Sequence, residues 1–296
     1  MGGAALYLPA THNRLDRVFT AESGIEATSF IVCTEDALAE SDLDDGLKQI
    51  ASLLPKLRTG SEAPRIFIRP RNEEVFIDLL MMKGIEKVDG FVIPKADTDS
   101  LPAYLQRVQG TSHGLMPVLE TKEVFDEQGR SSIRRMLARP EYQQRITTLR
   151  IGGNDLLRIM GMKRTKGVSV YETPLGTLIA QIVLAFRPDG FHLTGVVCDD
   201  FEDLDLLKRE VKTDILFGLC GKSAIHPRQV AVIESGFAIS EEDLSLARSI
   251  LENDQPAVFA QSGSMVERKV HATWAYSIMN RARLQSYRNK LSDQET

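Results

Sequence analysis

The sequence predicts an α/β fold, a (β/α)₈ barrel followed by a C-terminal helical arm. Short apolar runs alternate with segments of helical periodicity, which is the order expected of a parallel sheet covered by helices. Eight such strands, with helices between them, within roughly 235 residues match the usual size of a TIM barrel. An open doubly wound sheet is the alternative, but no GxGxxG motif follows any expected strand.

The elements follow from this alternation in chain order. The expected strands are the apolar runs at residues 5–9, 28–33, 65–70, 90–95, 114–120, 147–153, 190–198 and 214–220. The expected helices are those at residues 43–57, 73–83, 100–108, 133–138, 174–186, 201–211 and 228–234. The first of these helices has an acidic first turn, and the fifth begins with proline, both of which are typical of helix N-termini.

After residue 236 the pattern changes. A charged helix is expected at 241–253, a Gly/Ser-containing stretch follows at 259–264, and a long terminal helix is expected at 266–287. This segment is too short for an independent domain. We therefore expect a catalytic barrel over residues 1–237 and a helical arm or lid over residues 238–296 that packs on the barrel or on a neighbouring subunit.

The composition excludes several classes of protein. A chain of 296 residues that is 43% hydrophobic and 26% charged can bury a large core, which excludes a disordered protein. Its net charge is −5 and it has no dense basic block, so we expect no nucleic-acid partner. No apolar stretch approaches the roughly 20 residues of a membrane span, and the first residues lack the pattern of a signal peptide. A cytoplasmic protein is the expectation.

The cysteines are expected to be reduced residues of the core. Cys33, Cys198 and Cys220 lie far apart, and neither a CxxC motif nor a Cys/His spacing typical of zinc is present.

Acidic residues follow two neighbouring strands at the end of the barrel where active sites lie. Glu120 comes after the fifth expected strand and Asp155 after the sixth. Two carboxylates at adjacent strand ends can share one Mg²⁺, which completes its coordination with water and substrate oxygens. A metal on a 2-oxo acid would stabilise the enolate left when a carbon–carbon bond breaks, and Arg69, after the third strand, could grip the substrate carboxylate.

Each of these residues also has a structural interpretation. Asp155 precedes an apolar run and could cap a helix, while Arg69 could pair with Glu35 or Asp36 inside the barrel mouth. Lys95 could form a Schiff base, but an ion pair is favoured because nothing in the sequence lowers its pKa.

Two glycines also precede Asp155. The backbone amides of Gly152 and Gly153 could approach a substrate oxygen, or the two residues could simply form a turn.

Seven ordered motifs resemble the citrate lyase β-subunit-like branch of the HpcH/HpaI aldolase superfamily. They are LYLPATHNRLDRV, CTEDAL, IRPRN, FVIPKAD, PVLETKEVF, RIGGNDLLRIMG and LCGKSAIHPRQV. Each motif alone is weak, but together and in this order they cover nearly the whole chain. The family consists of metal-dependent TIM-barrel enzymes that act on acyl-CoA thioesters or oxo acids.

The resemblance implies roles for individual residues. Glu120 and Asp155 match the family's magnesium ligands, with Mn²⁺ as an alternative metal, and Arg69 matches its substrate-carboxylate arginine. Glu267 lies in a C-terminal segment similar to an arm that in several members reaches a neighbouring subunit's active site and supplies an acid. A general-base role for Glu267 or a salt bridge with Arg268 or Lys269 are the two interpretations.

The expected function is therefore a magnesium-dependent carbon–carbon lyase or aldolase, or the reverse condensation, acting on a small oxo acid or an acyl thioester. There are two alternatives. One is a subunit of a larger complex that acts on a carrier-bound acyl group, and the other is a degenerate barrel with a binding or scaffolding role. A homo-oligomer, with a trimer favoured, is expected from the resemblance. A polar loop at 163–173 carries Lys163, Arg164 and Lys166, which could meet a phosphate-bearing group such as CoA or be a solvated basic loop.

Overall fold

The barrel expected from the sequence is present. The computed structural model describes residues 2–60, 63–252 and 255–292. One compact unit comprises Met1–Thr59 and Ala63–Phe237, and Ala238–Thr296 belong to a second. In the first unit an eight-stranded sheet runs in the order β7-β6-β5-β4-β3-β2-β1-β8 with parallel pairing throughout. A parallel bridge between Gly195 and Lys222 brings β7 next to β8, so the ring is nearly closed.

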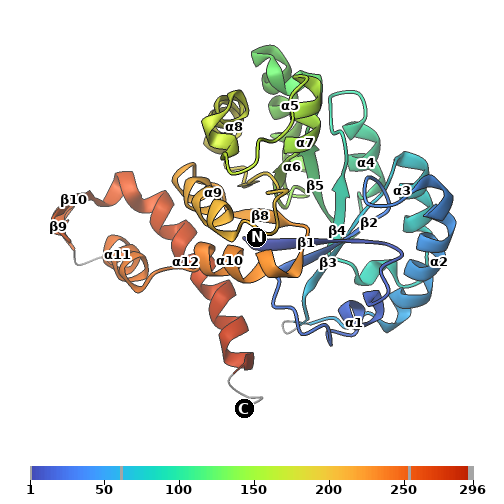
Figure 1. Cartoon of the computed structure of the whole chain (residues 1–296). Coiled ribbons are helices and arrows are strands. Elements are labelled where there is room, and N and C mark those ends of the chain that lie inside the picture. The colour runs from blue at the N-terminus through green and yellow to red at the C-terminus, as the bar shows by residue number, and fades with distance from the viewer. Residues whose placement is uncertain (1, 61–62, 253–254, 293–296) are drawn as a thin grey trace. The chain divides into compact units, whose positions relative to one another are not determined.

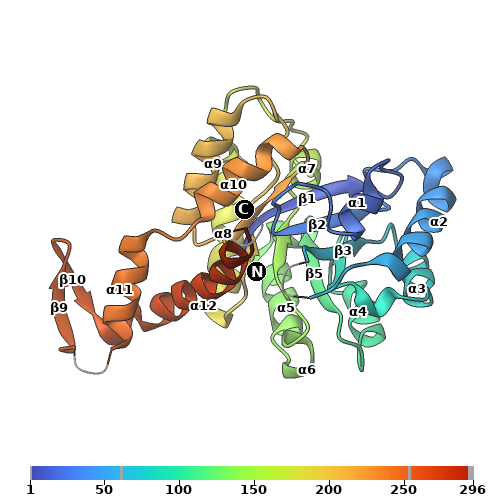
Figure 2. The same cartoon turned by 90° about the horizontal axis from the view of Figure 1, so that it is seen from below.

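The elements of the first unit alternate as a barrel requires. The strands are β1 Gly3–Pro9, β2 Ser29–Cys33, β3 Arg65–Arg69, β4 Gly90–Ile93, β5 Gly114–Leu119, β6 Leu149–Ile151, β7 Leu193–Thr194 and β8 Gly221–Ala224. The α-helices are α1 Leu15–Phe19, α2 Leu43–Leu53, α3 Glu73–Leu80, α4 Leu101–Arg107, α5 Glu127–Leu137, α6 Pro140–Gln143, α7 Gly153–Ile159, α8 Pro174–Phe186, α9 Leu204–Leu216 and α10 Pro227–Phe237. Short 3₁₀ helices are η1 Glu40–Asp42, η2 Leu54–Lys56, η3 Ile85–Lys87, η4 Lys122–Phe125, η5 Val170–Glu172 and η6 Arg187–Asp189. In Figure 1 the strands lie between α2 to α4 on one side and α8 to α10 on the other, and both views place α9 beside α10 (Figures 1 and 2).

Both faces of the barrel strands are buried, which explains their nearly continuous apolar runs. On β2, Phe30 packs into the layer between strands and helices, whereas the next residue, Ile31, packs inside the barrel. On β3, Ile68 and Phe67 divide in the same way. This alternation decides which polar side chains point into the barrel.

The prediction of the eighth strand at 214–220 is wrong, because these residues end α9 and form the following turn. Ile215 and Leu216 are 42% and 76% exposed, so their apolar side chains did not mark a buried strand. The strand itself, β8, consists of small residues around Lys222. Small residues are needed because β8 lies tightly against β1: a Cβ at Gly221 would come within 2.5 Å of the Gly3 carbonyl oxygen.

Other boundaries differ from the expectation to a smaller degree. The seventh strand, expected over 190–198, is only Leu193–Thr194, and α1 and α6 were not expected at all. Cys33, Cys198 and Cys220 are free and buried, as expected. Among the described residues, no helix combines the length and the apolar character that crossing a membrane requires.

The second unit consists of a helical pair and a hairpin. Helices α11 Glu241–Leu251 and α12 Arg268–Ser292 pack together, and strands β9 Val258–Gln261 and β10 Ser264–Glu267 form an antiparallel hairpin. The Gly/Ser stretch at 259–264 therefore provides most of the hairpin, with both of its turn residues, Ser262 and Gly263, at positive φ. Residue 253, the expected end of the charged helix at 241–253, lies outside the described residues.

Candidate active site

Charged side chains meet at the C-terminal end of the barrel strands. Arg69 ends β3, Lys95 follows β4 and Glu120 follows β5, while Glu35 and Asp36 follow β2. These five residues are called the strand-end cluster below. Their side chains are joined by hydrogen bonds and ion pairs, so positions that are far apart in the sequence form one site.

Arg69 is the centre of the strand-end cluster. It is 7% exposed, and its Nη2 lies 3.2 Å from both Asp36 Oδ2 and Glu120 Oε1 and pairs with Glu35 as well. The ion pairs with Glu35 and Asp36 that the sequence left open are thus present. Nε is buried and has no hydrogen-bond partner among the described residues. Burial alone would lower the pKa of Arg69, but the electrostatic effects of Tyr7, Glu120 and Glu35 outweigh it and raise that pKa.

Glu120 is a buried carboxylate with one oxygen fixed and one available. It is 3% exposed, and its Oε1 accepts hydrogen bonds from the Lys95 backbone N–H at 2.8 Å and from Arg69 at 3.2 Å. Within the described part of the chain, no hydrogen bond reaches Oε2. Burial raises the pKa of Glu120 to about 7; Asp155 adds to the rise, and Arg69 opposes it. A carboxylate in this state gains most from a cation beside its available oxygen.

Lys95 holds the cluster in place through both its backbone and its side chain. Its φ of 48° lies in the left-handed region, which is uncommon for a residue other than glycine. Nζ pairs with Glu35 at 2.6 Å. Burial would lower the pKa of Lys95, but the hydrogen bond and charge of Glu35 raise it. The charged ammonium that results is unsuited to form a Schiff base, and the ion pair is what the structure shows.

Space, and not backbone conformation, requires glycine before Asp155. A Cβ at Gly152 would come within 2.1 Å of Glu120 Oε2, and one at Gly153 within 2.8 Å of a Val196 side-chain carbon. Neither glycine has a positive φ, so the interpretation of a turn that needs glycine is wrong. The N–H of Gly152 already donates to the Leu119 carbonyl at 3.2 Å. Gly153 begins α7, where its N–H has no intrahelical acceptor.

Asp155 lies in the first turn of α7 and does not cap it. The N-cap is Gly152, and no side-chain hydrogen bond caps the helix, so the capping interpretation of Asp155 is wrong. Its Oδ1 pairs with Arg158 at 2.7 Å. The charge of Asp155 acts on both Glu120 and Lys95, which places this carboxylate within electrostatic reach of the strand-end cluster.

The donor set fits a hard cation held by two carboxylates. Glu120 and Asp155 each keep one oxygen that no described residue engages by a hydrogen bond. Among the described residues, no group of three or more His, Cys, Asp or Glu side chains is arranged to hold a metal ion. A cation at this position would therefore take its remaining ligands from water and substrate, as Mg²⁺ characteristically does.

In the loop at 163–173, Lys163 and Lys166 are exposed, as expected of a solvated basic loop, but Arg164 is neither solvated nor open to a phosphate. The Arg164 side chain is only 11% exposed and pairs with Glu210 at 2.9 Å. Glu210 and Asp214 on α9 in turn pair with Lys222 on β8 at 3.2 and 3.0 Å, and all three side chains are fully buried. Tyr171 donates a hydrogen bond to Asp214. The loop is therefore fastened to the barrel by a buried charge network.

In the second unit, Glu267 ends β10. Its N–H donates to His271 Nδ1 at 3.1 Å. Arg268 does not pair with Glu267, because its guanidinium donates to the carbonyls of Ile250 and Gln255 at 2.9 Å. The salt bridge with Arg268 is therefore wrong, and in the described chain no ion pair to Glu267 takes its place.

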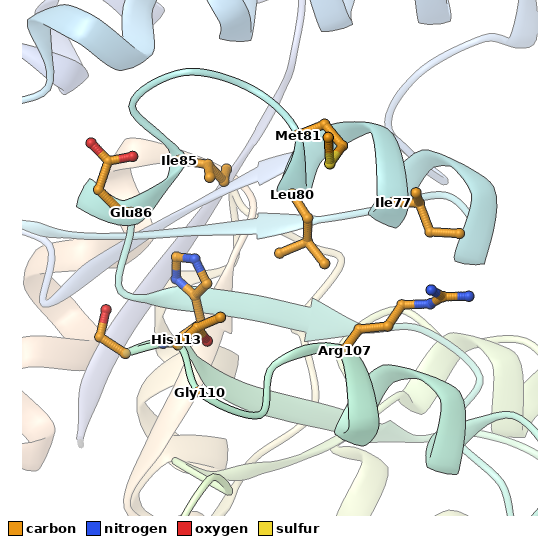
Figure 3. Close-up of a pocket in the computed structure, with 10 residues that line it drawn as sticks. Ile77, Leu80, Met81, Ile85, Glu86, Arg107, Gly110 and His113 are labelled. Carbon is orange, nitrogen blue, oxygen red and sulfur yellow. Dashed lines mark hydrogen bonds between the residues drawn. The ribbon is translucent and has the colours of Figure 1, made fainter.

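A hollow of about 710 Å³ lies on the outside of the barrel (Figure 3). It is lined by Ile77 and Leu80 of α3 and by residues that precede β4 and β5, so it lies at the end opposite the strand-end cluster. Two of its polar side chains have structural partners: His113 bonds to the Val88 carbonyl at 3.2 Å, and Arg107 pairs with a glutamate of α3. The hollow therefore offers no constellation for catalysis.

The chain is similar to several known proteins. It is 24% identical over 272 residues to a (3S)-malyl-CoA thioesterase of Cereibacter sphaeroides, covering 90% of this chain and 88% of that protein. An L-malyl-CoA/β-methylmalyl-CoA lyase of the same species is 25% identical over 64% of each chain. Among solved structures, a citrate lyase of Burkholderia xenovorans has a TM-score of 0.72 at 16% identity, with 97% and 93% of the chains covered. CitE of Mycobacterium tuberculosis has a TM-score of 0.67 at 22% identity, with 95% and 98% covered.

Residues 2–286 match the family model of the C–C bond lyases of the TIM-barrel fold. This match confirms the resemblance inferred from the seven motifs and identifies the chain as a lyase. The chain belongs to the C–C bond lyase family.

Proposed function

We propose that this lyase depends on Mg²⁺ held by Glu120 and Asp155 and acts on a small oxo acid or on an acyl thioester of the malyl-CoA type. The observation that carries the proposal is the state of Glu120. Its carboxylate is buried, has a pKa raised to about 7, and has one oxygen that no described residue engages. Burial disfavours the charged form of this carboxylate, and a divalent cation between Glu120 and Asp155 would compensate for that cost.

The residues of the strand-end cluster would divide the work at this site. Bound Mg²⁺ would act as a Lewis acid that stabilises negative charge developing on the substrate as the carbon–carbon bond breaks. Arg69 would receive a substrate carboxylate through Nε, which is buried and unpaired. Lys95 would hold Glu120 in position through its backbone N–H. Gly152 would leave the space that the Glu120 carboxylate occupies.

Similar proteins support this assignment. The structure of CitE from Mycobacterium tuberculosis is of a complex with magnesium, acetoacetate and coenzyme A. A malate synthase of Haloferax volcanii was solved with magnesium and glyoxylate, and it has a TM-score of 0.65 to this chain. Mn²⁺ is the alternative metal, because it accepts the same hard oxygen ligands.

Calorimetric titration of Mg²⁺ tests the proposal. Wild-type protein is expected to bind one Mg²⁺. The affinity should be about tenfold higher when pyruvate or oxaloacetate is present, because oxygens of the oxo acid would coordinate the metal. Asp155→Ala is expected to abolish binding. Arg158→Met is the matched control, since it removes the partner of Asp155 at 2.7 Å but no proposed ligand. Absence of Mg²⁺ binding by the wild type would refute the metal-dependent function.

The affinity for Mg²⁺ is expected to depend on pH. Because the pKa of Glu120 is raised to about 7, a proton competes with the metal below that pH. The dissociation constant should fall about tenfold per pH unit up to about pH 7 and become constant above about pH 8. Titrations at three pH values and equal ionic strength measure this. A constant affinity across the range would show that Glu120 is not a ligand.

We also propose that residues 238–296 form an arm at a subunit interface in a homo-trimer, with Glu267 as the general base. In support, the second unit exposes large apolar side chains, with Met265 at 66% and Val270 at 68% exposed. Glu267→Gln should lower kcat about 100-fold without changing the mass measured by light scattering. Lys269→Gln, in the same segment, is the control. Full turnover by Glu267→Gln would exclude the base role, and a monomeric wild type would exclude the interface.

A further inference from the structure

The interior of the barrel is apolar on one side and polar on the other. Strands β1 to β5 supply a small apolar cluster that includes Ile31, Phe67 and Val92. Strands β6, β7 and β8 instead supply Arg150, Thr194 and Ser223. The strand register supports this placement. Arg150 is paired laterally with Thr194, and neighbouring positions of parallel strands point to the same face.

Arg150 is a buried cation without an acidic partner. It is 2% exposed. Its Nη2 donates to Ser223 Oγ at 2.7 Å, its Nη1 lies 3.8 Å from Met116 Sδ, and its guanidinium carbon lies 5.5 Å from the centre of the Tyr7 ring. No ion pair joins it to a carboxylate in the described part of the chain. Because an arginine cannot lose its charge in a protein, such an isolated position is costly unless an anion binds there.

Thr194 gives a second, independent observation. The residue is 6% exposed, and its side-chain oxygen, Oγ1, is buried without a hydrogen-bond partner among the described residues. Buried hydroxyls are nearly always paired. The unpaired hydroxyl of Thr194 and the guanidinium of Arg150, which no carboxylate engages, stand at laterally paired positions and suit an oxygen-rich ligand.

This polar region lies directly below the strand-end cluster. Gly152 follows the end of β6, two residues after Arg150, and the Glu120 carboxylate fills the space beside Gly152. The ring of Tyr7 lies against Arg150. Tyr7 and Ser223, at the edge of this region, are only partly buried.

We infer that Arg150, Thr194, Ser223 and Tyr7 form a second anion-binding subsite at the barrel floor, which receives a carboxylate at the far end of a short substrate. An arginine fork flanked by hydroxyls matches the geometry of a carboxylate. The inference rests on the proposed function, since it adds to that site the requirement that its substrate carries two separated acidic groups. The subsite selects short dicarboxylic substrates over monocarboxylic ones of the same length.

Calorimetry with matched acids in EDTA tests the subsite without the metal. The probes are malonate, succinate and glutarate, each compared with the monocarboxylate of equal chain length: propionate, butyrate and valerate. In wild-type protein the best dicarboxylate should bind about tenfold more tightly than its partner, the size of one charged hydrogen bond. Arg150→Met should abolish this preference, and Arg107→Met, which removes an arginine from the outside of the barrel, should retain it.

A double variant, Thr194→Val with Ser223→Ala, keeps the test decisive if Arg150→Met does not fold. It should reduce the preference several-fold. Equal binding of the paired acids by the wild type, or a preference that survives in a folded Arg150→Met or is unchanged in the double variant, overturns the subsite. A parallel Mg²⁺ titration separates the two proposals. If the wild type does not bind Mg²⁺, the metal site is refuted, whereas the binding of acids measured in EDTA does not depend on the metal.

Discussion

Glu120→Gln is expected to lower kcat by about a thousandfold while the protein stays folded. The metal site would lose one of its two carboxylates, and the amide nitrogen of glutamine is a donor that cannot coordinate a cation. A Lewis acid contributes several kcal/mol to the transition state, and each 1.36 kcal/mol is tenfold in rate. Glutamine preserves the volume beside Gly152, where a Cβ would come within 2.1 Å of the Glu120 carboxylate.

The fold should tolerate the exchange. Arg69 keeps its ion pairs with Glu35 and Asp36 when Glu120 is neutral, so no buried cation loses all of its partners. Burial raises the pKa of Glu120 to about 7, which means that the ionised form is itself unfavourable at this position. The melting temperature of Glu120→Gln should therefore equal or exceed that of the wild type.

The assay is cleavage of the carbon–carbon bond, measured on a panel of 3-hydroxyacyl-CoA esters that begins with malyl-CoA. Glu127→Gln is the matched control. It makes the same chemical change outside the site, at an exposed residue of the next helix, α5. Near-normal turnover by Glu120→Gln would remove Glu120 from the mechanism. Equal losses in both variants would point to a general effect on the protein.

Strands with side chains buried on both faces could be predicted from the sequence. Ile31 and Phe67 point into the barrel and their neighbours Phe30 and Ile68 point to the helices, so these strands are continuous apolar runs. The eighth strand has no such run, because β8 needs small residues beside β1 and carries Lys222, whose charge is neutralised by acids from α9. Nothing local in the sequence reveals that compensation.

The strand-end positions placed Arg69, Glu120 and Lys95 together for the same reason: the ends of parallel strands meet at one edge. What could not be predicted is which side chains are already paired. Arg164 was expected on a polar loop, yet it is buried against Glu210 of α9, 46 residues later in the chain. Arg150 and Thr194 lie within short strands whose polarity gives no sign that the two side chains meet inside the barrel.

Lys222→Met is expected to destabilise the barrel by about 3–5 kcal/mol. The exchange keeps the length of the side chain but leaves Glu210 and Asp214 as buried carboxylates without their common cation. Lys222 Nζ lies 3.2 Å from Glu210 and 3.0 Å from Asp214, and none of the three side chains is exposed. Burial raises the pKa of Asp214 although Lys222 opposes it, so this carboxylate is already poorly compensated.

Thermal and urea unfolding measure the effect, which corresponds to a loss of roughly 6–20 °C in melting temperature for a domain of this size. Lys208→Met is the matched control: Lys208 pairs with Asp205 at 3.0 Å on the same helix, but both side chains are exposed, and such pairs contribute at most about 1 kcal/mol. The triple variant Lys222→Met, Glu210→Gln and Asp214→Asn should recover part of the loss, because it removes the stranded charges. If Lys222→Met and Lys208→Met were equally stable, the buried network would not be what fastens α9 and the loop at 163–173 to the barrel.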